Sequence, residues 1–193
     1  MDRVKLSISR AFIRERTRLT WREVLFGIEN ELLASGAAVE LAGDDLGARD
    51  NPPEVLLELA GLGKGEPTRG LVEQLANAAP NQDPAEIRGK WLYLVLGWIL
   101  EHKESYPDPL QMVEEVYADF DYPESVSAFV RYMPTREPDL GSRELNERRL
   151  YENWQRYLDD EGAKLAGANA SANESGLKVA TEIFERDIRR RER

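Results

Sequence analysis

The chain has 193 residues, with 26 basic and 36 acidic side chains that give a formal net charge of -10. This negative charge repels phosphate backbones, which argues against nucleic acid as the main partner. The sequence contains no cysteine and a single histidine, which excludes disulfides, thiolate ligands, a cysteine nucleophile and a zinc site built on histidines.

The first half of the chain predicts a series of short helices. Residues 1–19 mix strand-like alternation with a basic stretch, so we leave them unassigned; they lack the apolar run of a signal peptide, and we expect a cytoplasmic protein. Thr20 and Glu23 form a capping box that begins a helix whose apolar stripe ends at Ser35-Gly36. Further helices are predicted over residues 39–46, from Asn51-Pro52-Pro53 to Gly61 or Gly63, and over residues 67–79.

Asp83 caps the longest apolar element, a helix predicted over residues 84–103. Its side chains are apolar on nearly all sides, which is typical of a helix at the centre of a domain. The apolar run over 91–100 is about half of the ~20 residues that a bilayer requires, so we predict a core helix and no membrane span. His102 ends this helix, and we interpret it as a partner of the helix C-terminus and not as a catalytic base.

The second half of the chain predicts helices separated by prolines and a glycine-rich stretch. Asp108 and Pro109 begin a helix that ends at Tyr122-Pro123, and a short helix follows over 126–133. Ser142 caps another helix. After it, a stretch rich in Gly, Ala, Asn and Ser predicts a flexible connection.

These patterns predict an all-α protein of one domain, a bundle of about eight or nine helices around the central helix. The chain shows almost no strand signal. Its predicted parts are an N-terminal segment (1–19), a helical domain (20–161), a flexible connection (162–176) and a C-terminal helix (177–193).

The stretch EEVYADFDYPES, residues 114–125, contains five carboxylates and no lysine or arginine. Three acids in and beside it suit helix ends, with Asp108 as an N-cap and Asp121 and Glu124 near the start of the following helix. Together with the acids of the helix itself they make six carboxylates and no base over residues 108–124: Asp108, Glu114, Glu115, Asp119, Asp121 and Glu124.

Glu115 and Asp119 stand four residues apart and therefore share a helix face. Two like charges so placed cost a few tenths of a kcal/mol, which a basic partner or a bound cation would offset. One hypothesis is therefore a surface that attracts a basic protein, and another is a metal-dependent hydrolase that uses these two carboxylates. A glycosidase-like pair of carboxylates is a third hypothesis, and a solvated face without a specific role is the fourth.

The aromatic side chains of this region separate into core and surface candidates. Tyr117, Phe120 and Phe129 keep helical spacing and are predicted to lie in the core. Tyr122 and Tyr132 suit a binding surface, because tyrosine joins a large contact area to a polar tip.

The chain resembles an uncharacterised bacterial family of small acidic helical proteins, domain of unknown function number 2247, in the motifs LTWREVLFGIENELL, KWLYLVLGWILEHKESYPDPLQMVEEVYADFDYPESVSAFVRYMP and LYENWQRYL. The resemblance covers about residues 18–160 and leaves the tail after Gly162 outside. Families of this size and charge often contain immunity proteins, which neutralise secreted toxins by tight binding. The resemblance therefore implies a protein-binding role by analogy.

We hypothesise that the protein binds another protein, such as a basic toxin domain, and that it is not an enzyme and needs no cofactor. The hypothesis requires that the acids face outward and are not neutralised by cations of their own chain. The predicted contact group is Glu114, Glu115, Asp119, Asp121 and Tyr122.

Overall fold

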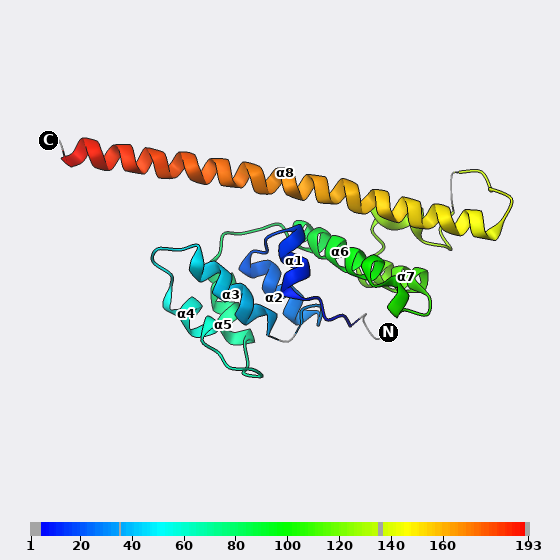
Figure 1. The fold of residues 1–193 in the computed structure, drawn as a ribbon, viewed down its shortest axis with the longest axis horizontal. Coiled ribbons are helices and arrows are strands. Elements are labelled where there is room, and N and C mark those ends of the chain that lie inside the picture. The colour runs from blue at the N-terminus through cyan, green and yellow to red at the C-terminus, as the bar shows by residue number, and fades with distance from the viewer. Residues whose placement is uncertain (1–4, 35, 135–136, 192–193) are drawn as a thin grey trace.

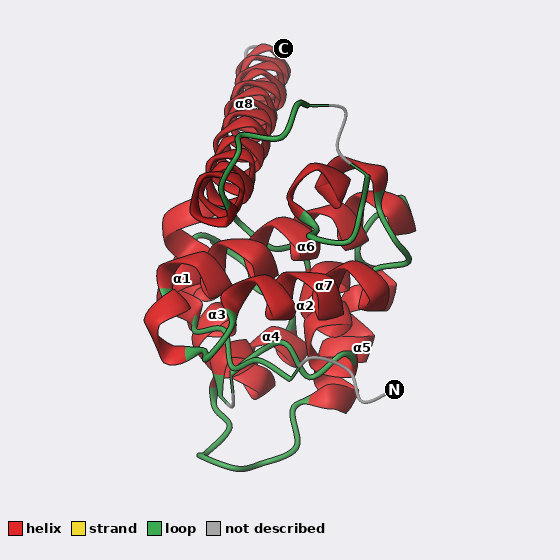
Figure 2. Cartoon of the chain, turned by 90° about the vertical axis from the view of Figure 1, so that its right-hand side faces the viewer, coloured by secondary structure: helices red, strands yellow, loops and turns green. Residues whose placement is uncertain are grey.

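The computed structural model describes residues 5–34, 36–134 and 137–191, with side chains described as far as residue 167. Throughout these ranges the chain consists of helices and loops, which confirms the predicted all-α fold (Figures 1 and 2). The α-helices are α1 (Arg10–Arg16), α2 (Trp21–Glu29), α3 (Ala37–Gly47), α4 (Glu54–Ala60), α5 (Arg69–Ala78), α6 (Pro84–Glu101), α7 (Pro109–Asp119) and α8 (Arg143–Arg191). Two short 3-10 helices, η1 (Lys103–Ser105) and η2 (Glu124–Phe129), lie on either side of α7 in the chain.

Capping side chains begin several helices at the predicted places. Thr20 and Glu23 form the capping box of α2, in which each side chain bonds the backbone N–H of the other residue. Asp83 and Asp108 likewise accept backbone hydrogen bonds at the starts of α6 and α7. Such caps contribute about 0.5 to 2 kcal/mol each. α3, α4 and α5 begin without a side-chain cap, and the N-cap of α4 is Pro53, although the sequence suggests Asn51.

α2 ends at Glu29, earlier than its apolar stripe predicts. The backbone is left-handed at Glu31, with φ of 55°, which ends the helical path. The chain then pairs with the N-terminal segment, where the Ile8 N–H donates to the Leu32 carbonyl oxygen at 3.1 Å and the Ala34 N–H donates to that of Ile8 at 2.9 Å. Leu32 is therefore buried as the stripe predicts, but from an extended segment.

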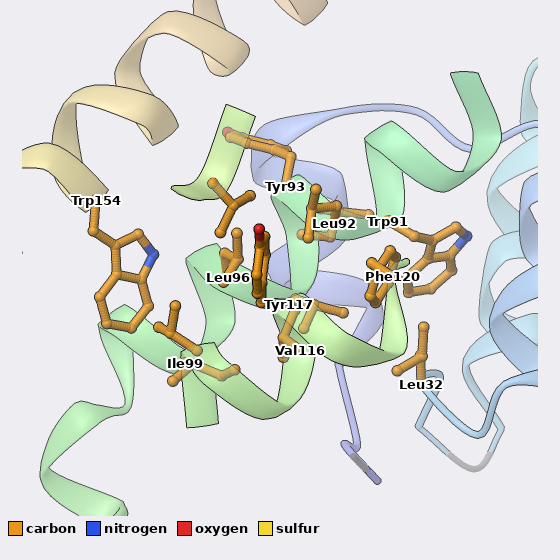
Figure 3. Close-up of a cluster of buried hydrophobic side chains, with 14 of the residues drawn as sticks. Leu32, Trp91, Leu92, Tyr93, Leu96, Ile99, Val116, Tyr117, Phe120 and Trp154 are labelled. Carbon is orange, nitrogen blue, oxygen red and sulfur yellow. The ribbon is translucent and has the colours of Figure 1, made fainter. Parts of the chain in front are cut away.

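Two apolar clusters fill the interior. The larger cluster surrounds α6, which buries its residues 91–97 and packs against α2, α7 and α8, as a central helix must (Figure 3). His102 ends α6 in its predicted structural role, because its Nδ1 lies 2.8 Å from the Trp98 carbonyl oxygen and its ring stacks on Trp98. The smaller cluster lies among α2, α3, α4 and α5 and contains Val24, Ala38, Ala42, Leu56, Leu59, Val72 and Leu75.

The contact between α2 and α6 is close and contains a buried carboxylate. A Cβ atom at position 27 would lie 2.2 Å from Cζ2 of Trp91, so only glycine fits there. The Trp91 Nε1–H donates to the Glu23 carbonyl oxygen at 2.8 Å. The carboxylate of Glu23 is fully buried, with Lys90 Nζ at 2.7 Å and a hydrogen bond from Gln82 Nε2 at 2.6 Å. Glu23, which closes the capping box of α2, thus also binds two side chains at α6, those of Lys90 and Gln82.

α8 is one continuous helix of 49 residues, whereas the sequence predicts a flexible connection over 162–176 and a separate last helix. The alanines of this stretch favour helix, its glycines cost only about 1 kcal/mol each, and it contains no proline. Near its start α8 packs against η2 and α6, and Trp154 is fully buried there. Figure 1 shows that the helix then extends past α4 to its C-terminal end. None of the described helices has both the length and the apolarity needed to cross a membrane.

Candidate functional site

α7 ends in a turn that fixes the position of Tyr122. After the capping residue Phe120, the backbone is left-handed at Asp121 and Tyr122, with φ of 62° and 57°. The Tyr122 N–H donates to the Tyr117 carbonyl oxygen at 2.8 Å. The Asp121 N–H donates to the Ala118 carbonyl oxygen at 3.2 Å. These bonds form a Schellman motif, whose first left-handed position usually holds glycine, so two residues with side chains keep this turn at a cost in strain.

Three tyrosines lie together beside this turn, and we call them the tyrosine patch: Tyr117, Tyr122 and Tyr132. Tyr117 is buried as predicted, and its ring centroid lies 5.2 Å from that of Tyr122 and 6.2 Å from that of Tyr132. The two outer tyrosines are exposed, Tyr122 by 60% and Tyr132 by 58%. Partial desolvation and the neighbouring tyrosines raise the pKa of Tyr132, so its hydroxyl is neutral at pH 7.

Arg131, which follows η2, bridges two of the six acids. Its Nε donates to Glu114 Oε1 at 2.8 Å, and its Nη1 donates to Asp108 Oδ2 at 2.7 Å. The hydrogen bond to Glu114 is the main cause that raises the pKa of Arg131 above its ordinary value. Partial burial pushes the pKa of Asp108 upward, but hydrogen bonds from Arg131 and from the Gln111 N–H outweigh it and hold that pKa below its ordinary value.

Arg88 of α6 pairs with Asp121 in the turn. The requirement that the acids have no cation partner in their own chain is therefore wrong for Asp108, Glu114 and Asp121. The reason is tertiary, because Arg88 and Arg131 both lie outside the acidic stretch and the fold brings them to it.

Glu115 and Glu124 differ from these three acids. Glu115 accepts a hydrogen bond from Gln111 Nε2 at 3.2 Å, and within the described part of the chain neither Glu115 nor Glu124 takes part in an ion pair. Asp119 borders a hollow of about 40 Å³ together with Phe120 and residues of α2 and α6. This volume suits a water molecule or two and lies far below the roughly 300 to 1,000 Å³ of small-molecule pockets. The surface is not shaped to enclose a substrate.

A wider cleft of about 450 Å³ lies between α1, α6 and α8. Among its charged side chains, Arg16 and Glu101 pair with each other at 2.7 Å. The cleft contains none of the predicted site residues, so it does not extend the candidate site.

The carboxylates of α7 do not gather into a metal site. Among the residues that the structure describes, no group of three or more histidine, aspartate or glutamate side chains could hold a metal ion. Glu115 and Asp119, the pair of the hydrolase hypothesis, therefore lack a third protein ligand there. A cation held by these two partly buried carboxylates alone would keep most of its water.

Sequence reasoning misses the two arginines that organise this surface. Arg131 is the only basic residue between Lys103 and Arg136, and this isolation among acids is the one signal that points to it. Arg88 carries no comparable signal, because its place beside Asp121 depends on how α6 packs against α7.

The comparisons with known proteins concern this same part of the chain. A family model described as an uncharacterized protein conserved in bacteria (DUF2247) matches residues 10–162, which include α7, the turn and the tyrosine patch. Comparison with curated proteins and with solved structures found no match. The resemblance seen in the sequence motifs is thus confirmed, and the chain belongs to the DUF2247 family of uncharacterised proteins conserved in bacteria.

Proposed function

We propose that the protein acts by binding another protein through α7, the turn that follows it and the tyrosine patch. The observation that carries the proposal is Tyr122, 60% exposed on a strained turn beside the equally exposed Tyr132. Large aromatic side chains held in one place favour binding, because they supply contact area with little loss of side-chain entropy.

Charge supports the same proposal. Arg88 and Arg131 offset only part of the six carboxylates of residues 108–124. The remaining negative charge would speed the encounter with a basic partner. We keep the contact group of Glu114, Glu115, Asp119, Asp121 and Tyr122 as the proposal, with the difference that Glu114 and Asp121 would meet the partner together with their arginines.

The finer proposal is that the partner is a basic toxin domain, which this protein neutralises in the cytoplasm as a non-enzymatic immunity protein. Its support is the net charge of -10, the small helical fold and the analogy with acidic immunity proteins. An acidic binder can block a basic nuclease by covering the surface that would hold phosphates. No observation favours the hydrolase, which stays a hypothesis from the sequence.

Photo-crosslinking in the native host tests the binding proposal. A photoreactive phenylalanine analogue replaces Tyr122 in the full chain, and the matched control carries it at Leu57 on α4, which is 51% exposed. We expect one protein to be joined at position 122 and not at 57, and the same protein, once purified, to bind the unmodified chain. Equal capture at both positions, or none at either, would contradict the proposal.

A charge reversal then tests the contact group on that purified partner. Glu115→Lys combined with Asp119→Lys should raise the Kd at least about tenfold, because two attractive charges become repulsive. The melting temperature should stay unchanged. An unchanged Kd in the folded double variant would exclude this face of α7 from the contact.

A further inference from the structure

We propose that the tyrosine patch is a receptor for an arginine side chain of the protein partner, whose guanidinium group stacks on the exposed rings of Tyr122 and Tyr132. This inference rests on the proposed function and names the chemistry that the partner presents at the centre of the surface.

The patch consists of two exposed tyrosines packed against a buried one. Tyr117 is buried beneath both outer rings, and its hydroxyl donates to Met133 Sδ at 3.7 Å, which ties α7 to the segment after η2. The Tyr122 backbone is held by its hydrogen bond to Tyr117. Tyr122 and Tyr132 thus each contact Tyr117 at one side, and each residue is more than half exposed.

The faces of these rings attract cations, and no cation of the described chain stacks on them. Aromatic faces carry partial negative charge and bind cations within about 6 Å of the ring centre. Within the described chain, Arg16 lies over Phe12 and Lys103 lies over Tyr151. The cations nearest the patch in sequence or across the turn, Arg131 and Arg88, are already bonded to carboxylates.

The charged groups around the patch favour a cation over other ligands. Glu114 acts on Tyr132 electrostatically, and Asp121 precedes Tyr122 in the chain. Arginines pair with Glu114 and Asp121, whereas Glu115 on α7 and Glu124 at the start of η2 take part in no ion pair within the described chain. An anionic ligand would be repelled, and a neutral apolar one would gain nothing from the carboxylates. Guanidinium is planar and weakly hydrated, and it stacks on aromatic rings. It can therefore contact the tyrosine rings and the nearby carboxylates at once, which ammonium does less well.

A peptide titration of the full chain, followed by NMR, tests this receptor without the natural partner. The probe is a short peptide with three arginines spaced by glycine and serine, and its matched control replaces each arginine by citrulline, a neutral group of the same shape. We expect the arginine peptide to shift the ring resonances of Tyr122 and Tyr132 and the citrulline peptide to leave them in place. Equal shifts from the two peptides would overturn the proposal.

Two pairs of substitutions distinguish the contribution of the tyrosine rings to peptide binding from that of their hydroxyl groups. Tyr122→Leu with Tyr132→Leu removes both rings and should raise the Kd of the arginine peptide roughly five- to thirtyfold, read from backbone amide shifts of the turn. Tyr122→Phe with Tyr132→Phe keeps the ring faces and should keep the Kd within about twofold. Both sites are exposed, so thermal unfolding should show that each variant folds. An unchanged Kd in the leucine pair overturns the assignment.

The crosslinking experiment and the peptide titration test different proposals, so their negative results can be told apart. A protein captured at Tyr122, together with a peptide titration that shows no preference for arginine, rejects the arginine receptor and keeps the binding function. Absence of any partner in the crosslinking experiment rejects the proposed function itself.

Discussion

Glu23 and Glu114 are two glutamates held by cations of their own chain, and they differ in their surroundings. Glu23 on α2 is fully buried, with Lys90 Nζ at 2.7 Å. Its carboxylate also accepts the Thr20 N–H at 2.8 Å, which closes the capping box. Glu114 on α7 has a side chain that is 21% exposed, with Arg131 Nε at 2.8 Å.

The comparison shows which charged groups the fold depends on. Removing one partner of a buried ion pair costs about 3 to 5 kcal/mol, because the remaining charge is left without compensation. Exposed pairs contribute about 0 to 1 kcal/mol. The junction of α2 and α6 therefore stabilises the domain, whereas the bridged acids of α7 contribute little to stability and remain available for contact.

The largest expected effect is that of Glu23→Ala. Lys90 would lose its counter-charge while only 15% exposed, and the Thr20 N–H would lose its acceptor. We expect the free energy of unfolding to fall by about 3 kcal/mol or more, measured by urea denaturation. Glu114→Ala is the matched control and should lower it by at most about 1 kcal/mol. Equal losses in the two variants would remove the contrast between the regions.

Gly27→Ala should give the next largest effect at the same junction. The added methyl group would overlap Trp91, so either ring or helix must move, at a cost of about 1 to 3 kcal/mol. Gly43→Ala in α3 is the control, because a Cβ there meets nothing within 4 Å. It should stabilise the protein by about 0.5 to 1 kcal/mol, as alanine favours helix over glycine. A stable Gly27→Ala variant would show that α2 is not held this close to α6 in solution.

Arg131→Ala tests the exposed network and its dependence on pH. The pKa of Asp108 is lowered in the fold, so its interactions stabilise the folded state above the ordinary value of 3.8 and are lost as the pH falls through the lowered value. We expect a loss of about 1 kcal/mol or less at pH 7, shrinking in acid below about pH 4. Urea denaturation at both pH values measures it. A deficit that grows in acid would have the wrong sign for this mechanism.

Asp121→Gly should have the smallest effect and the opposite sign. Glycine accepts the left-handed conformation without strain, and the pair with Arg88 is too exposed to contribute much. We expect stabilisation by about 0.5 kcal/mol in thermal unfolding, with weaker capture of the partner. Destabilisation would mean that the exposed pair with Arg88 matters more than its surroundings suggest.

Local features of this fold could be predicted and tertiary ones could not. Caps such as Thr20 and Asp83 act on backbone groups within three residues, so the sequence alone locates them. The continuation of α8 through residues 162–176 could not be predicted, because alanine and glycine there give opposite signals. For the candidate site, the exposure of Tyr122 agrees with its predicted surface role, but the pairing of Glu114 with Arg131 depends on packing that no spacing reveals.

In the Schellman turn after α7, backbone atoms fix position 122, whereas its side chain forms the exposed surface. The bond that fixes it joins two main-chain atoms, the Tyr122 nitrogen and the Tyr117 oxygen, so most replacements of the side chain leave the bond in place. A substitution at position 122 can therefore replace this single ring with another group while the helix and its closing turn persist. Under the proposed binding function, a change of this one side chain would alter the contact surface and leave the scaffold unaltered.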